Sequence, residues 1–163
     1  MWFQRQSRAD IHAAEPAARA RAVAAGEAGE CALRRLVARD PDAGVRQAAV
    51  RRLQDLVILR QVFETDADAA VRETARARYR QLLAGGDRLA FSYRRAALQA
   101  CPDHQIIAHV ARSAREPALR MAALGRVDEA GLLAEVHAHD PVARVRARAA
   151  ERLRELAAEG ERL

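Results

Sequence analysis

Lysine is absent from this sequence, and all 28 of its basic residues are arginines. They stand against 22 acids, which gives a formal net charge of +6. Two causes compete for this bias. A GC-rich coding bias favours arginine and alanine together without any binding partner, whereas a nucleic acid or an acidic protein favours arginines clustered on one face. The placement of the arginines, and not their total charge, has to decide between the two.

Aromatic residues and cysteines are also scarce. Aromatics are 4% of the 163 residues while half of the residues are hydrophobic, so the core has to be built mainly from alanine, leucine, valine and isoleucine. Such a core suits closely packed helices. Cys31 and Cys101 are far apart in sequence and have no nearby histidine. We therefore expect two buried thiols in a reducing compartment, and neither a disulfide framework nor a metal site.

Long apolar runs are missing as well. The longest strongly apolar run is LVIL at residues 56–59, far short of the roughly 20 residues that a membrane helix needs. Gln4 and Arg5 follow the first three residues in place of an apolar signal-peptide core. The sequence therefore predicts a cytoplasmic protein with no membrane segment.

What the sequence does contain is a repeat, best seen in residues 40–53, DPDAGVRQAAVRRL. An apolar residue precedes an arginine, alanine follows three positions later, and the fourth position is usually apolar. We number each copy from this arginine, position zero. Six copies fit, with position zero at Arg19, Arg46, Arg72, Arg94, Arg120 and Arg146. Regular recurrence over 20 to 50 residues is typical of stacked repeats that bury their faces against their neighbours.

Helix start signals divide each copy into a helix, a tight turn and a second helix. Asp40 is followed by Pro41, and we expect the Asp40 side chain to cap the helix that runs to Leu53. Asp66 is expected to start a long helix over residues 67–83 in the same way. Apolar residues at three-to-four spacing predict first helices over residues 30–39, 55–64 and 103–115. Further second helices are predicted over residues 16–25, 87–100 and 142–159.

Gly85 and Gly86 interrupt the pattern, and here the distance between successive position-zero arginines falls to 22 residues. One first helix is therefore expected to be shortened or lost. The segments EPAAR at 15–19 and EPALR at 116–120 mark a longer-range duplication. We predict an N-terminal cap over residues 1–14 and two related sub-arrays over residues 15–84 and 87–163.

Aspartate six residues before arginine, inside a helix-turn-helix unit with two apolar stripes, resembles the HEAT and HEAT-like repeat families. The resemblance implies an all-α fold, an α-solenoid of about six repeats wound as a right-handed superhelix. It also implies a concave face lined by second helices and a binding role. The segment at residues 122–133 is further similar to the start of the helical repeats in long bacterial proteins of unknown function. In HEAT-like repeats aspartate and arginine form a ladder between neighbouring units, a role that the resemblance assigns to Asp40, Arg46, Asp66, Arg72, Arg120, Asp140 and Arg146. For Arg19 and Arg94, which have no acid six residues before them, the ladder role is left open.

A second row of arginines lies six residues after position zero, at Arg52, Arg78, Arg126 and Arg152. Projecting from successive second helices, these guanidinium groups would suit an acidic helix, an acidic tail or a phosphate backbone. The alternative is that their stems cover apolar edges while their heads face solvent or pair with nearby glutamates. Both interpretations stay open.

Catalytic patterns are lacking. His104 and His109 are five residues apart, about 140° around a helix, and His137 and His139 also diverge, so no metal or other cofactor is expected. No His-Glu pair occurs, unlike in di-iron hydroxylases built on HEAT-like repeats. No phosphate loop or nucleophile motif is present. Tyr79 falls at a core position, as does Tyr93, so base stacking like that of HEAT-like DNA glycosylases is poorly provided for.

These observations favour a non-enzymatic scaffold, expected to be a monomer, that binds an acidic or helical protein segment on its concave face. The second arginine row is the predicted contact surface. The alternative is weakly sequence-specific binding of nucleic acid through the same arginines, which would weaken steeply with salt.

Overall fold

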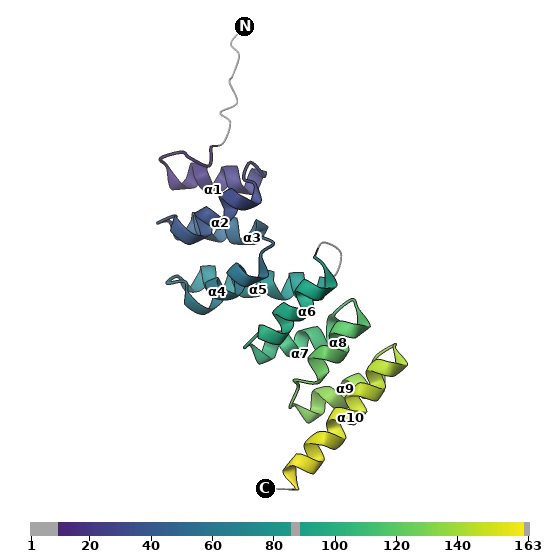
Figure 1. The fold of residues 1–163 in the computed structure, drawn as a ribbon. Helices are drawn as coiled ribbons and strands as arrows, with labels where there is room; N and C mark the ends of the chain where they lie inside the picture. Colours follow the sequence, from purple (N-terminus) through teal and green to yellow (C-terminus); the bar gives the residue numbers. More distant parts are fainter. Residues whose placement is uncertain (1–9, 86–88, 162–163) are drawn as a thin grey trace. The chain divides into compact units, whose positions relative to one another are not determined.

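The computed structural model describes residues 10–85 and 89–161, and every regular element in these ranges is an α-helix. The helices are α1 (Pro16–Ala25), α2 (Glu30–Arg39), α3 (Ala43–Arg52), α4 (Leu56–Thr65), α5 (Ala69–Gly85), α6 (Phe91–Ala100), α7 (His104–Ser113), α8 (Pro117–Leu124), α9 (Ala130–His139) and α10 (Ala143–Gly160) (Figure 1). The all-α class is therefore confirmed, and the predicted helix ranges agree with the observed ones to within a few residues.

Aspartate side chains cap four of the described helices, α3, α4, α5 and α7, but at α3 and α5 the capping residue differs from the one predicted. Asp42, not Asp40, caps α3, because its side chain accepts the N–H of Val45 at 3.0 Å. Asp68, not Asp66, likewise accepts the N–H of Val71 at the start of α5. The expectation that the first aspartate of each turn is the cap was thus wrong. That aspartate accepts only the N–H two residues on, which leaves most of its carboxylate for another partner.

The chain divides into two compact units, Met1–Tyr79 and Arg80–Leu163, and the division falls inside α5. In the first unit α3 packs against both α1 and α2. Val23, Val45 and Leu53 are completely buried there, as apolar residues on facing helix stripes should be. Tyr79 closes this core, with its ring edge against Phe63 at a centroid distance of 5.4 Å.

In the second unit α8 packs against α6, α7 and α10, and α9 packs against α7 and α10. Helices that carry a position-zero arginine alternate with helices that do not. The exception is the passage from α5 to α6, where no helix intervenes in the described residues. The 22-residue spacing predicted this loss of a first helix.

Three further expectations concern single residues or segments. Cys101 is buried, as predicted, but Cys31 lies exposed near the start of α2 because its position falls outside the apolar stripe of that helix. The predicted N-terminal cap falls mostly on residues 1–9, which are outside the described residues. Within the described part of the chain, no helix has both the length and the apolarity needed to cross a membrane.

Candidate functional site: two rows of inter-repeat arginines

Each position-zero arginine binds the turn that precedes its own helix. Nη1 of Arg46 donates to the carbonyl oxygens of Asp40 and Pro41 at 3.0 and 3.2 Å. The same nitrogen contacts the carbonyl six residues earlier in Arg19, Arg72, Arg120 and Arg146. The six-residue spacing between Asp40 and Arg46 therefore reflects a bond to the aspartate's backbone and not to its carboxylate.

The remaining fork of the guanidinium reaches the next repeat. Nε and Nη2 of Arg46 each donate to the carboxylate of Asp66 at 3.0 Å. The same two-pronged contact joins Arg19 to Asp40 at 2.9 and 3.0 Å, and Arg120 to Asp140 at 2.8 and 3.1 Å. Such bidentate arginine–carboxylate pairs are strong and geometrically specific. Each one ties the turn of one repeat to the turn of the next.

Arg19 and Arg94 both belong to this set, although the residues six positions before them left this role open. Arg94 is 1% exposed and donates to both carboxylate oxygens of Glu116, its acid in the next repeat. The partner acid lies 20 to 22 residues after the arginine. A search for acids at that distance, instead of six residues before, would have found all four pairs. We call Arg19, Arg46, Arg94 and Arg120 the paired ladder arginines.

The ladder acids owe part of their charge state to these contacts. The hydrogen bond from Arg46 holds the pKa of Asp66 below its ordinary value against the opposing effect of burial. Burial is the largest influence on Asp40 and would raise its pKa. Hydrogen bonds from Arg19 and from the Asp42 N–H outweigh it, so that the pKa is lowered. Asp40 and Asp66 are therefore held ionised.

The second arginine row also points to the preceding repeat, but it binds backbone carbonyls. Arg78 Nε donates to the Leu53 carbonyl at 3.1 Å, and Arg152 Nε donates to the Val127 carbonyl at 3.1 Å. Arg126 donates to the carbonyls of Leu98 and Cys101, the latter at 2.8 Å. These oxygens lie where a helix ends and leaves carbonyls without intrahelical donors, and a positive charge is favourable there.

The four members of this row differ in how much of each guanidinium is occupied. Arg152 also pairs with Asp128, Glu155 and Glu159, and its side chain is only 12% exposed. Arg52 is exposed and makes one long bond, 3.4 Å, from Nη1 to the Ala24 carbonyl. It lies against Gly26, which ends α1 with φ +91, a backbone conformation that favours glycine. Arg52 thus keeps the most hydrogen-bonding capacity for an outside partner.

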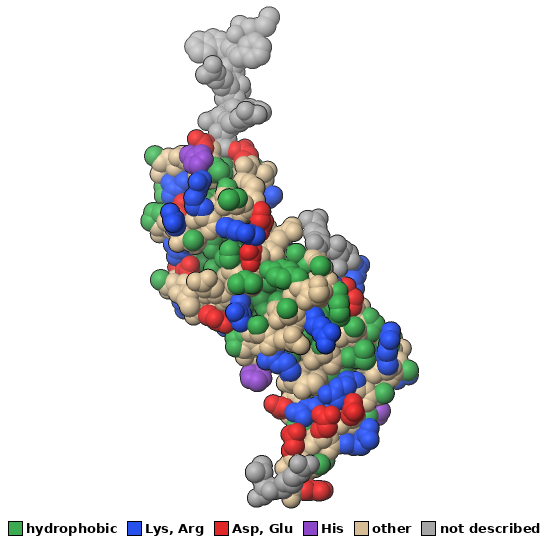
Figure 2. All heavy atoms as spheres, viewed as in Figure 1, with side chains coloured by type: hydrophobic (Ala, Val, Ile, Leu, Met, Phe, Trp, Pro, Cys, Tyr) green, Lys and Arg blue, Asp and Glu red, His purple; other side chains and the backbone are tan. Residues whose placement is uncertain are grey.

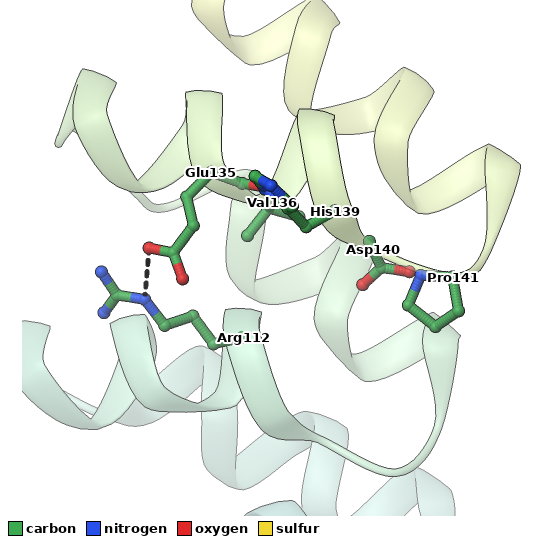
Figure 3. A pocket seen from close by; sticks show the side chains of 6 residues that line it. All are labelled: Arg112, Glu135, Val136, His139, Asp140 and Pro141. Atoms are coloured by element: carbon green, nitrogen blue, oxygen red, sulfur yellow. Dashed lines mark hydrogen bonds and ion pairs between the residues drawn. The ribbon is translucent and has the colours of Figure 1, made fainter.

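A hollow of about 140 Å³ opens beside α9 (Figure 3). Arg112 pairs with Glu135 across it at 3.1 Å, and Asp140, at its other end, is held by Arg120. Small-molecule sites are usually several hundred Å³ and keep convergent polar groups available. This hollow is smaller, and its charged groups already have partners.

The described histidines do not converge on one another. Burial, together with Arg80 and Arg112, lowers the pKa of His109, so that its neutral form is favoured. No group of three metal-binding side chains occurs within residues 10–85 and 89–161.

Figure 2 shows arginines and acids intermingled over the lower part of the second unit. Residues 10–79 contain 12 arginines and 11 acids, and residues 80–161 contain 13 and 11. The net positive charge is therefore not gathered in either unit.

The fold and the two arginine rows define an all-helical protein whose successive helix pairs are joined by guanidinium contacts. No family model, curated protein or solved structure matches this chain. Its function has to be inferred from its own residues.

Proposed function

We propose that the chain is a HEAT-like repeat scaffold without enzymatic activity, wound as a right-handed α-solenoid, whose concave face binds an acidic or helical segment of a protein partner. The repeated arginine–carboxylate contact between successive helix pairs supports this proposal. It recurs with the same atoms in both units, at Arg46–Asp66 in the first and Arg120–Asp140 in the second. Repeats locked to their neighbours in this way present a pre-organised surface, which lowers the entropic cost of binding.

Arg52 is the residue through which this surface first meets an acidic partner. A guanidinium carries five N–H donors, and Arg52 engages one of them, at 3.4 Å, with a described residue. Arg51 beside it is exposed as well, so two positive charges lie at the C-terminal end of α3. Arg78, Arg126 and Arg152 continue the row, with their guanidinium groups held toward the preceding repeat. Their role is to position the edge of the surface on which Arg52 acts.

Nucleic acid is the weaker candidate partner. Binding to a phosphate backbone requires a field of uncompensated positive charge. Here the arginines are nearly balanced by acids in each unit. Of the two tyrosines, Tyr79 is buried and Tyr93 is half-buried, so neither presents an open ring face to a base. No observation specifically favours nucleic acid.

Fluorescence anisotropy with defined probes tests the proposal. The probes are a labelled glutamate-rich helical peptide, the same peptide with glutamine in place of glutamate, and a random-sequence DNA duplex, each measured at low and moderate salt. Of these three probes, we expect only the acidic peptide to bind measurably. Arg52→Glu should weaken its binding by about tenfold or more through lost attraction and new repulsion, with helicity unchanged.

Arg154→Glu is the matched control, because Arg154 is exposed on α10 and its one described hydrogen bond is to the carbonyl four residues earlier on its own helix. It changes the net charge equally and should leave peptide binding nearly unchanged. Binding of the acidic and neutral peptides with equal affinity would contradict the proposal. Tight, salt-sensitive binding of the duplex alone would point to the nucleic-acid alternative.

A further inference from the structure

Arg146, the position-zero arginine of the last described repeat, has half of the ladder contact. Its Nη1 donates to the Asp140 carbonyl at 2.7 Å, as Arg120 Nη1 does to the Ala114 carbonyl. In Arg120 the remaining fork, Nε and Nη2, grips the carboxylate of Asp140. The corresponding fork of Arg146 has no carboxylate partner within residues 10–85 and 89–161. Nε and Nη2 of Arg146 therefore form a pair of donors, and the contact of Nη1 with the Asp140 carbonyl holds the guanidinium as in the ladder arginines.

The helix face beside this fork is also incompletely covered. Seven residues after position zero, the side chain is buried in the preceding repeats, at Leu53, Tyr79, Cys101 and Val127. The equivalent residue of α10, Leu153, is only half-buried. The position four residues after position zero behaves alike, since Leu98 and Leu124 are buried whereas Ala150 is half-buried. The last repeat therefore presents a small apolar face next to the fork of Arg146.

Glu15, near the other end of the described chain, could supply the carboxylate of such a ladder contact. It precedes Pro16 and begins α1 with φ −77 and ψ 124, and Glu116 precedes Pro117 and begins α8 with φ −82 and ψ 124. The arginine four residues later binds the turn in both cases, since Arg19 Nη1 contacts the Ala14 carbonyl and Arg120 Nη1 contacts the Arg115 carbonyl. The two glutamates thus occupy the same place in the same turn.

Only one of these two glutamates has a described ladder partner. Glu116 accepts hydrogen bonds from both terminal nitrogens of Arg94, the ladder arginine of the repeat before it. Glu15 is exposed, and no described side chain donates to its carboxylate. It therefore has the backbone setting of a ladder acid without the arginine that would complete the pair.

We propose that a second copy of this chain binds at this surface, so that the fork of Arg146 in one copy binds the carboxylate of Glu15 in the next. The contact is an arginine–glutamate pair between chains, as Arg94 and Glu116 form within one chain, but it uses Nε and Nη2 in place of the two terminal nitrogens, with α10 of one copy facing α1 of the other. Ala150 and Leu153 are covered in the same step. Because the two surfaces are different, the association is heterologous and joins copies head to tail. This contact lies apart from Arg52 and does not depend on the proposed partner surface.

Sedimentation velocity from low micromolar to near-millimolar concentration tests the inference on the intact chain. We expect the wild type to associate increasingly with concentration, and less at high salt. Arg146→Glu and Glu15→Arg should each lower the association constant by about tenfold or more, because each places like charges opposite one another. Far-UV circular dichroism identifies any variant that fails to fold.

Charge exchange makes the test specific. An equimolar mixture of the Arg146→Glu and Glu15→Arg chains should regain association, because the introduced glutamate of one chain then meets the introduced arginine of the other. Arg144→Glu and Glu27→Arg are the matched controls, since both side chains are exposed, Arg144 on α10 and Glu27 just after α1, and they should change association little. A wild type that remains monomeric throughout the range, or a mixture no better associated than either variant alone, would overturn the inference.

Discussion

The ladder arginines and the second-row arginines lie six residues apart along the chain, yet they bind different chemical groups. Arg120 is buried and binds the Asp140 carboxylate of the following repeat. Arg126 instead reaches back to the carbonyls of Leu98 and Cys101 in the preceding repeat. The ladder arginine forms an ion pair with a carboxylate, whereas the second-row arginine donates to carbonyl oxygens at the end of a helix. Helices α3 and α8 carry both kinds of contact, since Arg46 and Arg120 reach the turn that follows and Arg52 and Arg126 reach back to the helix end that precedes.

Removing a buried ladder arginine should have the largest effect on stability. In the Arg120–Asp140 pair the side chains are 8% and 4% exposed. Arg120→Ala leaves the Asp140 charge buried without its partner, and we expect the free energy of unfolding to fall by about 3–5 kcal/mol. Denaturant unfolding followed by circular dichroism measures the loss.

Arg146→Ala is the matched comparison for that variant. Arg146 occupies the same repeat position with the same backbone contact but without a described carboxylate. At concentrations where the chain is monomeric, its loss should cost no more than about 1 kcal/mol. Equal losses for the two variants would show that the carboxylate pair adds nothing to the backbone contact.

Replacing second-row arginines with alanine should lower the free energy of unfolding by smaller amounts, which differ from one arginine to the next. Arg126→Ala removes a charged donor from at least two helix-end carbonyls, which should cost about 1.5–3 kcal/mol. Arg52→Ala removes one long, exposed bond and should change the free energy of unfolding by less than about 0.5 kcal/mol. Thermal or denaturant unfolding of the two variants side by side checks the order. A larger loss for Arg52 would contradict the division of roles within the row.

Acid should weaken the first unit through its ladder acids. The pKa values of Asp40 and Asp66 are lowered in the folded chain. Their stabilisation is complete above the ordinary carboxyl pKa of about 4 and is lost as the pH falls through the lowered values. The unfolding free energy should therefore decline below about pH 4, and Asp66→Asn should make that decline shallower. An unchanged acid profile in Asp66→Asn would show that the carboxylate is not coupled to folding.

Much of the fold could be predicted from sequence because its signals are local. The spacing of apolar residues located the helices, and the shortened sequence distance between Arg72 and Arg94 predicted that one first helix is missing. The caps were misplaced by two residues at Asp40 and Asp66, since each turn contains two aspartates and only the backbone geometry decides which one faces the first helical turn.

The candidate site was harder to predict because its contacts join different repeats. An arginine can find its acid 20 residues away only after the intervening helix has folded back, so Arg19 and Arg94 had no local signature. The partners of the second row are harder still, because a backbone carbonyl is present at every residue. Only the position where the preceding helix ends makes the Leu98 and Cys101 carbonyls available to Arg126.

The most direct test of the ladder is a pair of double-mutant cycles that share Arg46. One cycle couples it to Asp66 of the next repeat, and the other couples it to Asp40, six residues earlier, whose carboxylate faces Arg19. Inter-repeat pairing predicts a coupling of about 1–3 kcal/mol between Arg46 and Asp66 and a clearly smaller value between Arg46 and Asp40. Equal couplings, or a larger one to Asp40, would contradict it.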